Sequence, residues 1–293
     1  MKRKILLSII GLAHILLASS QVVSSGKATI HINNRPKVAD NTGNIVFRQA
    51  GDTDARPAVL GKYYALIIGI NNYQDPLISE LDKPIKDAEL FYNALTSRYT
   101  FEESDVRLLR NATMEDIVNA LDYYAKVVKP EDSFLIFYAG HGVWDLDAEI
   151  GFWLPSDARK DSKLAWFRNS TLRDYLREIS SKHTLLISDA CFGGSIFKTR
   201  AAFTDATLAI NKLYELPSRK AMTSGTLTEV PDQSAFLKYL VERLNNNNEK
   251  YLSAEQLFSS FRIAVINNSN VVPQFGEIKE VGDEGGDFIF ILR

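Results

Sequence analysis

Hydrophobic runs alternate along the chain with segments in which hydrophobic residues recur at helical spacing. The run at 63–70 is uninterrupted and shows no period-two alternation. Strands that are buried on both faces have this pattern, because neither side of the strand faces water. Two further runs, at 133–139 and from 185 onward, end abruptly in glycine and polar residues. The sequence therefore predicts interior strands of a parallel sheet.

The segments between these runs predict helices. Pro84 stands at a plausible first helical position, and the pairs Thr113/Asp116 and Ser253/Gln256 have the spacing of a capping box. We predict helices at 84–98, 113–127, 172–179, 234–245 and 253–267, and additional strands at 106–109, 221–224 and 287–292. Alternating strands and helices form βαβ units, so the fold class is α/β with a mostly parallel sheet.

The first 60 residues differ from the rest. Lys2, Arg3 and Lys4 precede an apolar stretch of about 14 residues, which ends at Ala18-Ser19-Ser20. This pattern predicts a secretory signal peptide at 1–20. The alternative is an uncleaved membrane anchor, but 14 residues fall short of the roughly 20 that are needed to span a bilayer as a helix. Residues 21–60 are polar and predict a linker or pro-segment, and 61–293 form the domain. We expect a protein exported to the periplasm or the extracellular space, with no stable membrane span after signal removal.

Composition and charge narrow the classes of function. Hydrophobic residues make up 45% of the chain, which supports a globular core and excludes disorder of the whole chain. The net charge of −2 gives no reason to expect nucleic acid as a general partner. The residues after the first strand, 69–72, read Gly-Ile-Asn-Asn, so neither glycine-rich phosphate-binding motif is present there. This argues against a nucleotide-binding domain.

The only cysteine of the chain lies where a predicted strand ends. One apolar run is followed by Asp189-Ala190-Cys191-Phe192-Gly193-Gly194, and another by Gly140-His141-Gly142. Sites of parallel sheets lie at the carboxyl ends of the strands, and a cysteine with a histidine elsewhere in the sequence is a candidate nucleophile and base. The other histidines fall in the predicted leader, the linker and the start of a strand. We therefore expect the thiol of Cys191 to lie beside the imidazole of His141.

Asp189 is expected to face the same cleft as Cys191, because residues i and i+2 of a strand share a face. A carboxylate beside an anionic nucleophile is unfavourable unless a cation joins it, which predicts a substrate with Lys or Arg before the scissile bond. The backbone N–H groups of Gly142 and Cys191 are candidate oxyanion donors. Each residue also has a structural interpretation: Cys191 as a small buried residue, His141 as a turn residue and Asp189 as a turn cap.

Taken together, these segments resemble the caspase-like cysteine peptidases, and are more similar to the bacterial and metacaspase branch than to the animal caspases. The resemblance extends from about residue 62 to the C-terminus and rests on segments 64–73, 85–88, 137–142 and 189–194. One departure is Ala139, where many relatives carry serine. The resemblance implies a caspase-hemoglobinase fold, a three-layer sandwich with about six strands and helices on both faces.

The resemblance also implies roles for individual residues. Cys191 would be the nucleophile, His141 the general base and acid, and Gly142 and Cys191 the oxyanion donors. Asp87 and Asp189 match the two acids that line the basic specificity pocket of metacaspases, so the expected substrates are peptides or proteins cut after Arg or Lys.

Several alternatives stay open at this stage. No cofactor is expected, but some metacaspases need calcium, and Asp145, Asp147 and Asp157 lie in the corresponding loop. Self-cleavage at Lys198, Arg200, Arg219 or Lys220 is a hypothesis, and the oligomeric state is unknown. A caspase-like domain kept as a catalytically silent binding or regulatory module is the alternative function.

Overall fold

The structure is a computed structural model that describes residues 61–190, 196–197, 210–225 and 234–293. The predicted signal peptide and linker, Cys191 and the possible cleavage sites Lys198 and Arg200 lie outside the described residues. Within the described part of the chain, no helix is long and apolar enough to cross a membrane.

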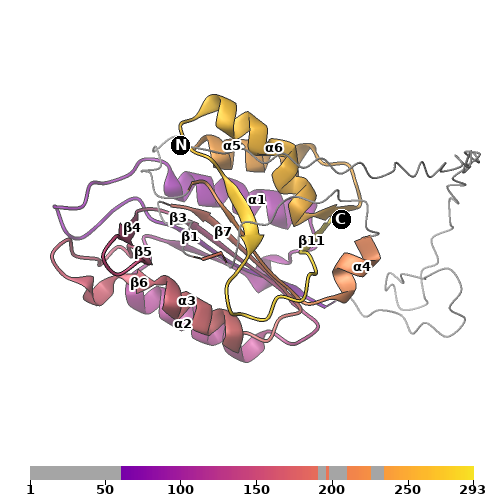
Figure 1. The fold of residues 1–293 in the computed structure, drawn as a ribbon, viewed down its shortest axis with the longest axis horizontal. Coiled ribbons are helices and arrows are strands. Elements are labelled where there is room, and N and C mark those ends of the chain that lie inside the picture. Colours follow the sequence, from indigo (N-terminus) through magenta and orange to yellow (C-terminus); the bar gives the residue numbers. More distant parts are fainter. Residues whose placement is uncertain (1–60, 191–195, 198–209, 226–233) are drawn as a thin grey trace, which may run out of the picture. The chain divides into compact units, whose positions relative to one another are not determined.

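A six-stranded sheet forms the centre of the described fold (Figure 1). Its strand order is β10-β8-β7-β3-β1-β2, and only β10 runs antiparallel to its neighbour. The strands are β1 (Tyr63–Gly69), β2 (Val106–Arg110), β3 (Ser133–Ala139), β7 (His183–Asp189), β8 (Ser218–Thr223) and β10 (Gln274–Glu277). The predicted mostly parallel sheet is confirmed.

Helices cover both faces of this sheet, as Figure 1 shows. They are α1 (Pro84–Arg98), α2 (Met114–Val127), α3 (Asn169–Glu178), α4 (Ile210–Glu215), α5 (Ala235–Asn246) and α6 (Ala254–Asn268), with short 3₁₀ turns at Glu103–Asp105 and Lys163–Ala165. Both predicted capping boxes are present, Thr113 with Asp116 at α2 and Ser253 with Gln256 at α6. These caps satisfy N–H groups that the first turn leaves without intrahelical partners.

Successive side chains of a strand point to opposite faces of the sheet, and this produces two hydrophobic cores, one on each face of the central sheet. Alternate residues of β1, β3 and β7 pack with α1, α5 and α6 in one core, and the intervening residues pack with α2 and α3 in the other. Gly69 ends β1 where α1 begins, and a Cβ there would lie 2.7 Å from the Pro84 carbonyl oxygen and 2.8 Å from the Ile85 Cα. Only glycine allows this close approach of strand and helix.

The structure adds strands that the sequence pattern did not predict. The segment between β3 and α3 forms a small antiparallel sheet of β4 (Gly142–Asp145), β5 (Ile150–Trp153) and β6 (Phe167–Arg168), where we expected a long loop. The predicted last strand at 287–292 shortens to β11 (Ile289–Ile291), which pairs with β9 (Tyr251–Ser253) outside the main sheet. Strands of two to four residues are too short to show a clear period in sequence.

His183 provides a test of the fold through its titration. It begins β7, is fully buried, and its Nε2 lies 3.0 Å from the Tyr214 carbonyl oxygen. Burial lowers its pKa to about 4 from the ordinary value of 6.5. The unfolded chain therefore binds more protons than the folded chain between these two values. The contribution of His183 to the free energy of unfolding should therefore fall as the pH is lowered through this window, by at most about 1.4 kcal/mol per pH unit. Asp287 is buried with a pKa raised to about 7 and contributes with the opposite sign, so the effect of His183 is measured as a difference from a variant.

Urea unfolding of the wild type and of His183→Gln at pH values across this window measures the effect. Gln cannot take up the proton, so lowering the pH from 6.5 to 4 should destabilise the wild type relative to the variant, whatever the difference between them at neutral pH. The same pH dependence in both proteins would contradict the assignment.

Candidate active site

The register of the central strands determines where the candidate residues lie. Ala139 at the end of β3 is opposite Asp189 at the end of β7, and Gly69 at the end of β1 is opposite Ala139. In the sequence, His141 comes two residues after Ala139, and Cys191 comes two residues after Asp189. Cys191 itself lies outside the described residues.

The ring of His141 contacts a backbone group that the sequence analysis did not identify. Its Nε2 lies 2.8 Å from the carbonyl oxygen of Ser79 and 3.4 Å from the Ser79 hydroxyl. A carbonyl oxygen can only accept a hydrogen bond, so this contact places the ring proton on Nε2. In the neutral ring, Nδ1 is then the nitrogen with a free electron pair, and it is the atom that can take up a proton.

Two tyrosine hydroxyls bind the backbone of His141. The N–H of His141 donates to the Tyr73 hydroxyl at 2.8 Å, and the Tyr138 hydroxyl donates to the carbonyl oxygen of His141 at 2.7 Å. Burial raises the pKa of Tyr73, so its hydroxyl stays protonated. A Cβ on Gly140 would lie 2.9 Å from the Tyr138 hydroxyl and 3.2 Å from the Tyr73 hydroxyl. Glycine at this position therefore allows both tyrosines to approach the strand end.

The loop that carries Tyr73 and Ser79 is itself fixed by two asparagines. The side-chain oxygen of Asn111 accepts hydrogen bonds from the N–H groups of Asn71 and Asn72, at 2.9 and 3.0 Å. The side-chain oxygen of Asn71 accepts from the N–H of Ile85 at 2.8 Å, in the first turn of α1. Asn111 has a φ of 49°, in the left-handed region that asparagine tolerates better than most residues. The loop is thereby tied to the start of α1 and to the end of β2.

Gly142, the candidate oxyanion donor, opens strand β4. Leu154 donates its N–H to the His141 carbonyl oxygen at 3.0 Å, and Gly142 is opposite Trp153. In an antiparallel ladder, hydrogen-bonded and non-hydrogen-bonded pairs alternate, so Gly142 and Trp153 form a non-hydrogen-bonded pair. The N–H of Gly142 therefore points away from β5 and remains available to another acceptor.

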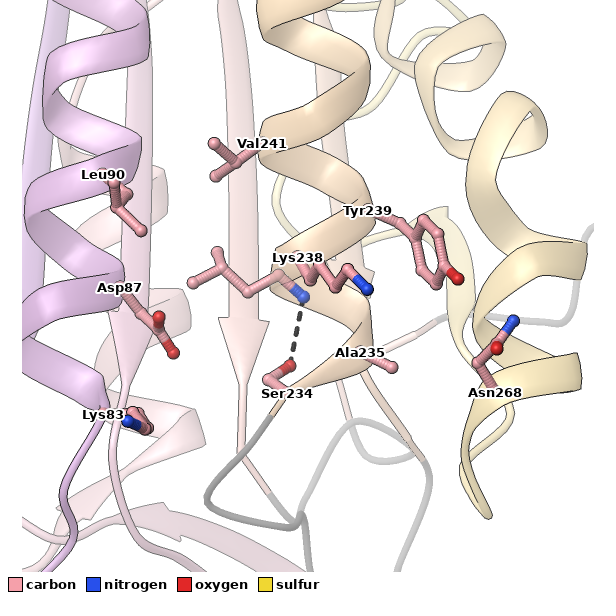
Figure 2. Close-up of a pocket in the computed structure, with 10 residues that line it drawn as sticks. Lys83, Asp87, Leu90, Ser234, Ala235, Lys238, Tyr239, Val241 and Asn268 are labelled. Atoms are coloured by element: carbon pink, nitrogen blue, oxygen red, sulfur yellow. Dashed lines mark hydrogen bonds between the residues drawn. The ribbon is translucent and has the colours of Figure 1, made fainter.

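Asp87 lines a cavity of about 600 Å³ between α1 and α5 (Figure 2). This volume lies within the roughly 300–1,000 Å³ that is usual for ligand pockets. Residues of both signs and apolar residues line it: Lys83, Asp87, Leu90, Ser234, Ala235, Leu237, Lys238, Tyr239, Val241 and Asn268. Figure 2 shows Asp87 on the α1 side of the cavity and Ser234 at the start of α5.

Asp189 lies at the end of β7 and does not line this cavity directly. It shares a strand face with Leu185 and Ile187, which belong to the core under α1 and α5. Its side chain is 7% exposed, and burial raises its pKa, although the nearby Ser234 and Ser224 hydroxyls oppose the shift. Among the described residues, its Oδ1 has no hydrogen-bond partner. Ser234 thus lines the same cavity as Asp87 and also lies beside the buried carboxyl group of Asp189.

Two of the three acids considered for calcium, Asp145 and Asp157, have other partners. Asp145 pairs with Lys163, and Asp157 accepts a hydrogen bond from the N–H of Met114 at 2.8 Å. Within the described ranges, no group of three or more His, Cys, Asp or Glu side chains is arranged to hold a metal ion.

Two of the possible self-cleavage positions fall within β8. Arg219 is buried, and its guanidinium donates to the carbonyl oxygens of Ser181, Lys182 and Ser218. Lys220 pairs with Asp283 at 3.0 Å. Both residues belong to a strand paired on both sides, so their peptide bonds are inaccessible in the folded chain.

Comparison with known proteins connects this arrangement to one family. The family model described as the caspase domain matches residues 62–280. The chain is 30% identical to metacaspase-1 of Meyerozyma guilliermondii over 130 residues, and 32% identical to metacaspase-1 of Saccharomyces cerevisiae over 99 residues. These regions cover 40% and 30% of this chain, and 31% and 22% of the two relatives.

The structure is also similar to a solved one. A crystal structure of a protein from Geobacter sulfurreducens aligns with a TM-score of 0.51 at 19% identity, over 78% of this chain and 99% of that one. At this identity the likeness concerns the fold alone.

The hydroxyl of Tyr73 can be tested by its removal. Tyr73→Phe keeps the ring but leaves the N–H of His141 without its acceptor, which typically costs about 1–3 kcal/mol of stability. Tyr123→Phe is the matched control, because Tyr123 is 36% exposed on α2. Urea unfolding should show a clear loss for Tyr73→Phe and nearly none for Tyr123→Phe. Equal stability of the two variants would contradict the role of the Tyr73 hydroxyl.

Proposed function

Because the chain belongs to the caspase domain family of cysteine peptidases and has the caspase-hemoglobinase fold, we propose that it is a cysteine endopeptidase that cleaves peptide bonds after Arg or Lys. Cys191 is the nucleophile, and His141 is the general base and acid. The observation that carries the proposal is the fixed orientation of the His141 ring, with Nε2 on the Ser79 carbonyl oxygen and Nδ1 left to accept a proton.

The chain connectivity supports the meeting of the two groups. Cys191 follows the described, buried Ala190 directly in the chain. Neighbouring strands lie about 4.8 Å apart, and His141 and Cys191 have the same two-residue offset from the facing pair Ala139 and Asp189. A strand-to-strand distance of this size is within the reach of a thiol and an imidazole.

The residues would perform the reaction in two stages. His141 Nδ1 takes the proton of the Cys191 thiol, and the thiolate attacks the substrate carbonyl carbon. The N–H groups of Gly142 and Cys191 bind the oxyanion, and His141 returns its proton to the departing amine. Water, deprotonated by His141, then hydrolyses the thioester and restores the thiol. The Ser79 carbonyl oxygen stabilises the charged ring that forms in each stage.

The preference for a basic residue is supported by the two carboxyl groups. Asp189 is buried with an unpaired oxygen, an arrangement that is costly unless a cation is brought to it. Asp87 lies on the wall of the adjoining cavity, and Ser234 connects the two positions. An Arg or Lys side chain that enters between α1 and α5 would supply the missing charge. An exported enzyme, as residues 1–20 predict, would act on proteins outside the cytoplasm.

The dyad is tested with a fluorogenic peptide that ends in Arg. Cys191→Ala and His141→Ala should each abolish its hydrolysis, because the first removes the nucleophile and the second the proton acceptor, while circular dichroism shows an unchanged fold. Assays with and without calcium measure any metal dependence in parallel. Residual turnover by Cys191→Ala would contradict the mechanism, and a folded wild type with no turnover on any basic peptide would favour the silent binding module.

The pocket is tested by neutralising its buried acid. Asp189→Asn preserves the volume but removes the charge, and should lower kcat/KM for Arg peptides by about 100-fold. The matched control is Asp161→Asn, an exposed acid paired with Arg159, which should have no effect.

The pH profile gives a second readout. Only the carboxylate form of Asp189 attracts a cation, so wild-type kcat/KM for Arg peptides should rise as the pH increases through the raised pKa of this group. The same rise should be absent from Asp189→Asn. A variant that retains the preference for Arg over Asp peptides would refute the pocket assignment.

A further inference from the structure

Among the described residues, nothing pairs with the outer edge of strand β4, which begins at the candidate oxyanion donor Gly142. It follows His141 directly in the chain, and it is the outer strand of the small sheet, whose order is β4-β5-β6. All four of its residues are partly exposed, whereas three of the four residues of its partner β5 are buried. Within the part of the chain that the structure describes, one side of β4 is therefore paired with β5 and the other side has no paired strand.

The ladder register determines which backbone groups occupy the open edge. Gly142 is opposite Trp153, Val143 opposite Phe152 and Trp144 opposite Gly151. Because Gly142 begins a non-hydrogen-bonded pair, alternation makes Val143 a hydrogen-bonded position and Trp144 again a non-hydrogen-bonded one. The N–H and C=O groups of Gly142 and Trp144 thus point away from β5. Among the described residues, neither outward N–H has a hydrogen-bond partner.

We propose that this edge binds the substrate chain on the C-terminal side of the scissile bond, as an added parallel strand. The proposal rests on the proposed peptidase function, because it requires the Gly142 N–H to hold the carbonyl oxygen of the residue before the scissile bond. In a parallel ladder, the Gly142 carbonyl oxygen then accepts the N–H of the second residue after the scissile bond. The Trp144 N–H donates to the carbonyl oxygen of that same second residue.

The direction of the substrate follows from the surroundings of His141. The side chain before the scissile bond enters the cavity between α1 and α5, on one face of the main sheet. The small sheet packs with the core on the opposite face, through Trp153 and Phe167. His141 must deliver its proton to the departing amine, so the C-terminal part of the substrate starts at His141. Strand β4 follows His141 and leads away from the cavity, so it is the strand along which the C-terminal part of the substrate can lie.

The open edge can be removed without breaking the sheet. Proline lacks an N–H and is tolerated at edge positions whose N–H faces outward, so Trp144→Pro deletes only the outward donor of the backbone. The φ of Trp144 is not positive, and Val143 before it is in the extended conformation that a residue preceding proline adopts. Trp144→Ala is the matched control, because it removes the same indole side chain but keeps the N–H.

The experiment compares two Arg substrates in these two variants, one with a coumarin amide as leaving group and one extended by four residues beyond the scissile bond. On the extended peptide, Trp144→Pro should have a kcat/KM about tenfold below that of Trp144→Ala, the effect of one hydrogen bond. On the coumarin amide the two variants should be equal. Equal values on both substrates would overturn the proposal, and so would a tenfold loss that appears on both.

A second measurement needs no variant of the protein. N-methylation of the backbone nitrogen of the second residue after the scissile bond removes the N–H that the Gly142 carbonyl oxygen would accept. The control peptide ends in Gln at the fourth residue after the scissile bond and is methylated on the side-chain amide of that Gln. Wild-type kcat/KM should be about tenfold lower for the first peptide than for the control. No difference between the two peptides would also overturn the proposal. Failure of the peptidase function itself is distinguishable, because the wild type would then leave the coumarin substrate uncleaved.

Discussion

The proposed site depends on the register of β3 and β7, which places Ala139 at the end of β3 opposite Asp189 at the end of β7. Parallel strands in fixed register bring the segments that follow them to one edge of the sheet, and the proposed pairing of His141 with Cys191 rests on this. The same register gives Asp189 its surroundings, because its strand face belongs to the core beneath α1 and α5. A slip by one residue would turn Asp189 to the other face and separate it from Ser234.

His141 is oriented by groups from outside its own strand. The Ser79 carbonyl oxygen fixes the ring, and the hydroxyls of Tyr73 and Tyr138 fix its backbone. Tyr73 and Ser79 belong to the loop between β1 and α1, which Asn111 holds from the end of β2. The ends of three neighbouring strands therefore cooperate in positioning one imidazole. Such preorganisation reduces the reorganisation that a proton transfer would otherwise require.

The sequence predicted the features that have a strong local pattern. Uninterrupted apolar runs indicated β1, β3 and β7, and the abrupt polar endings of two of them indicated where His141 and Asp189 lie. The Ser79 contact could not be predicted, because a backbone carbonyl leaves no trace in the residue type. Strand β4 was missed because its four residues, Gly142 to Asp145, are too few to show a period. The final strand was predicted at 287–292 and is observed at Ile289–Ile291. Its pairing with β9 rather than with the main sheet depends on tertiary packing that a local pattern does not encode.

In the proposed site, the thiol of Cys191 is a nucleophile and lies beside a pocket for a cationic side chain. Mass spectrometry of the full chain after treatment with two thiol-reactive peptide probes, one ending in Arg and one in Asp, tests this claim directly. The account predicts rapid modification of Cys191 by the Arg probe, slow modification by the Asp probe and protection by an Arg peptide in excess. Equal labelling by both probes, or no labelling of Cys191 in the folded protein, would contradict it.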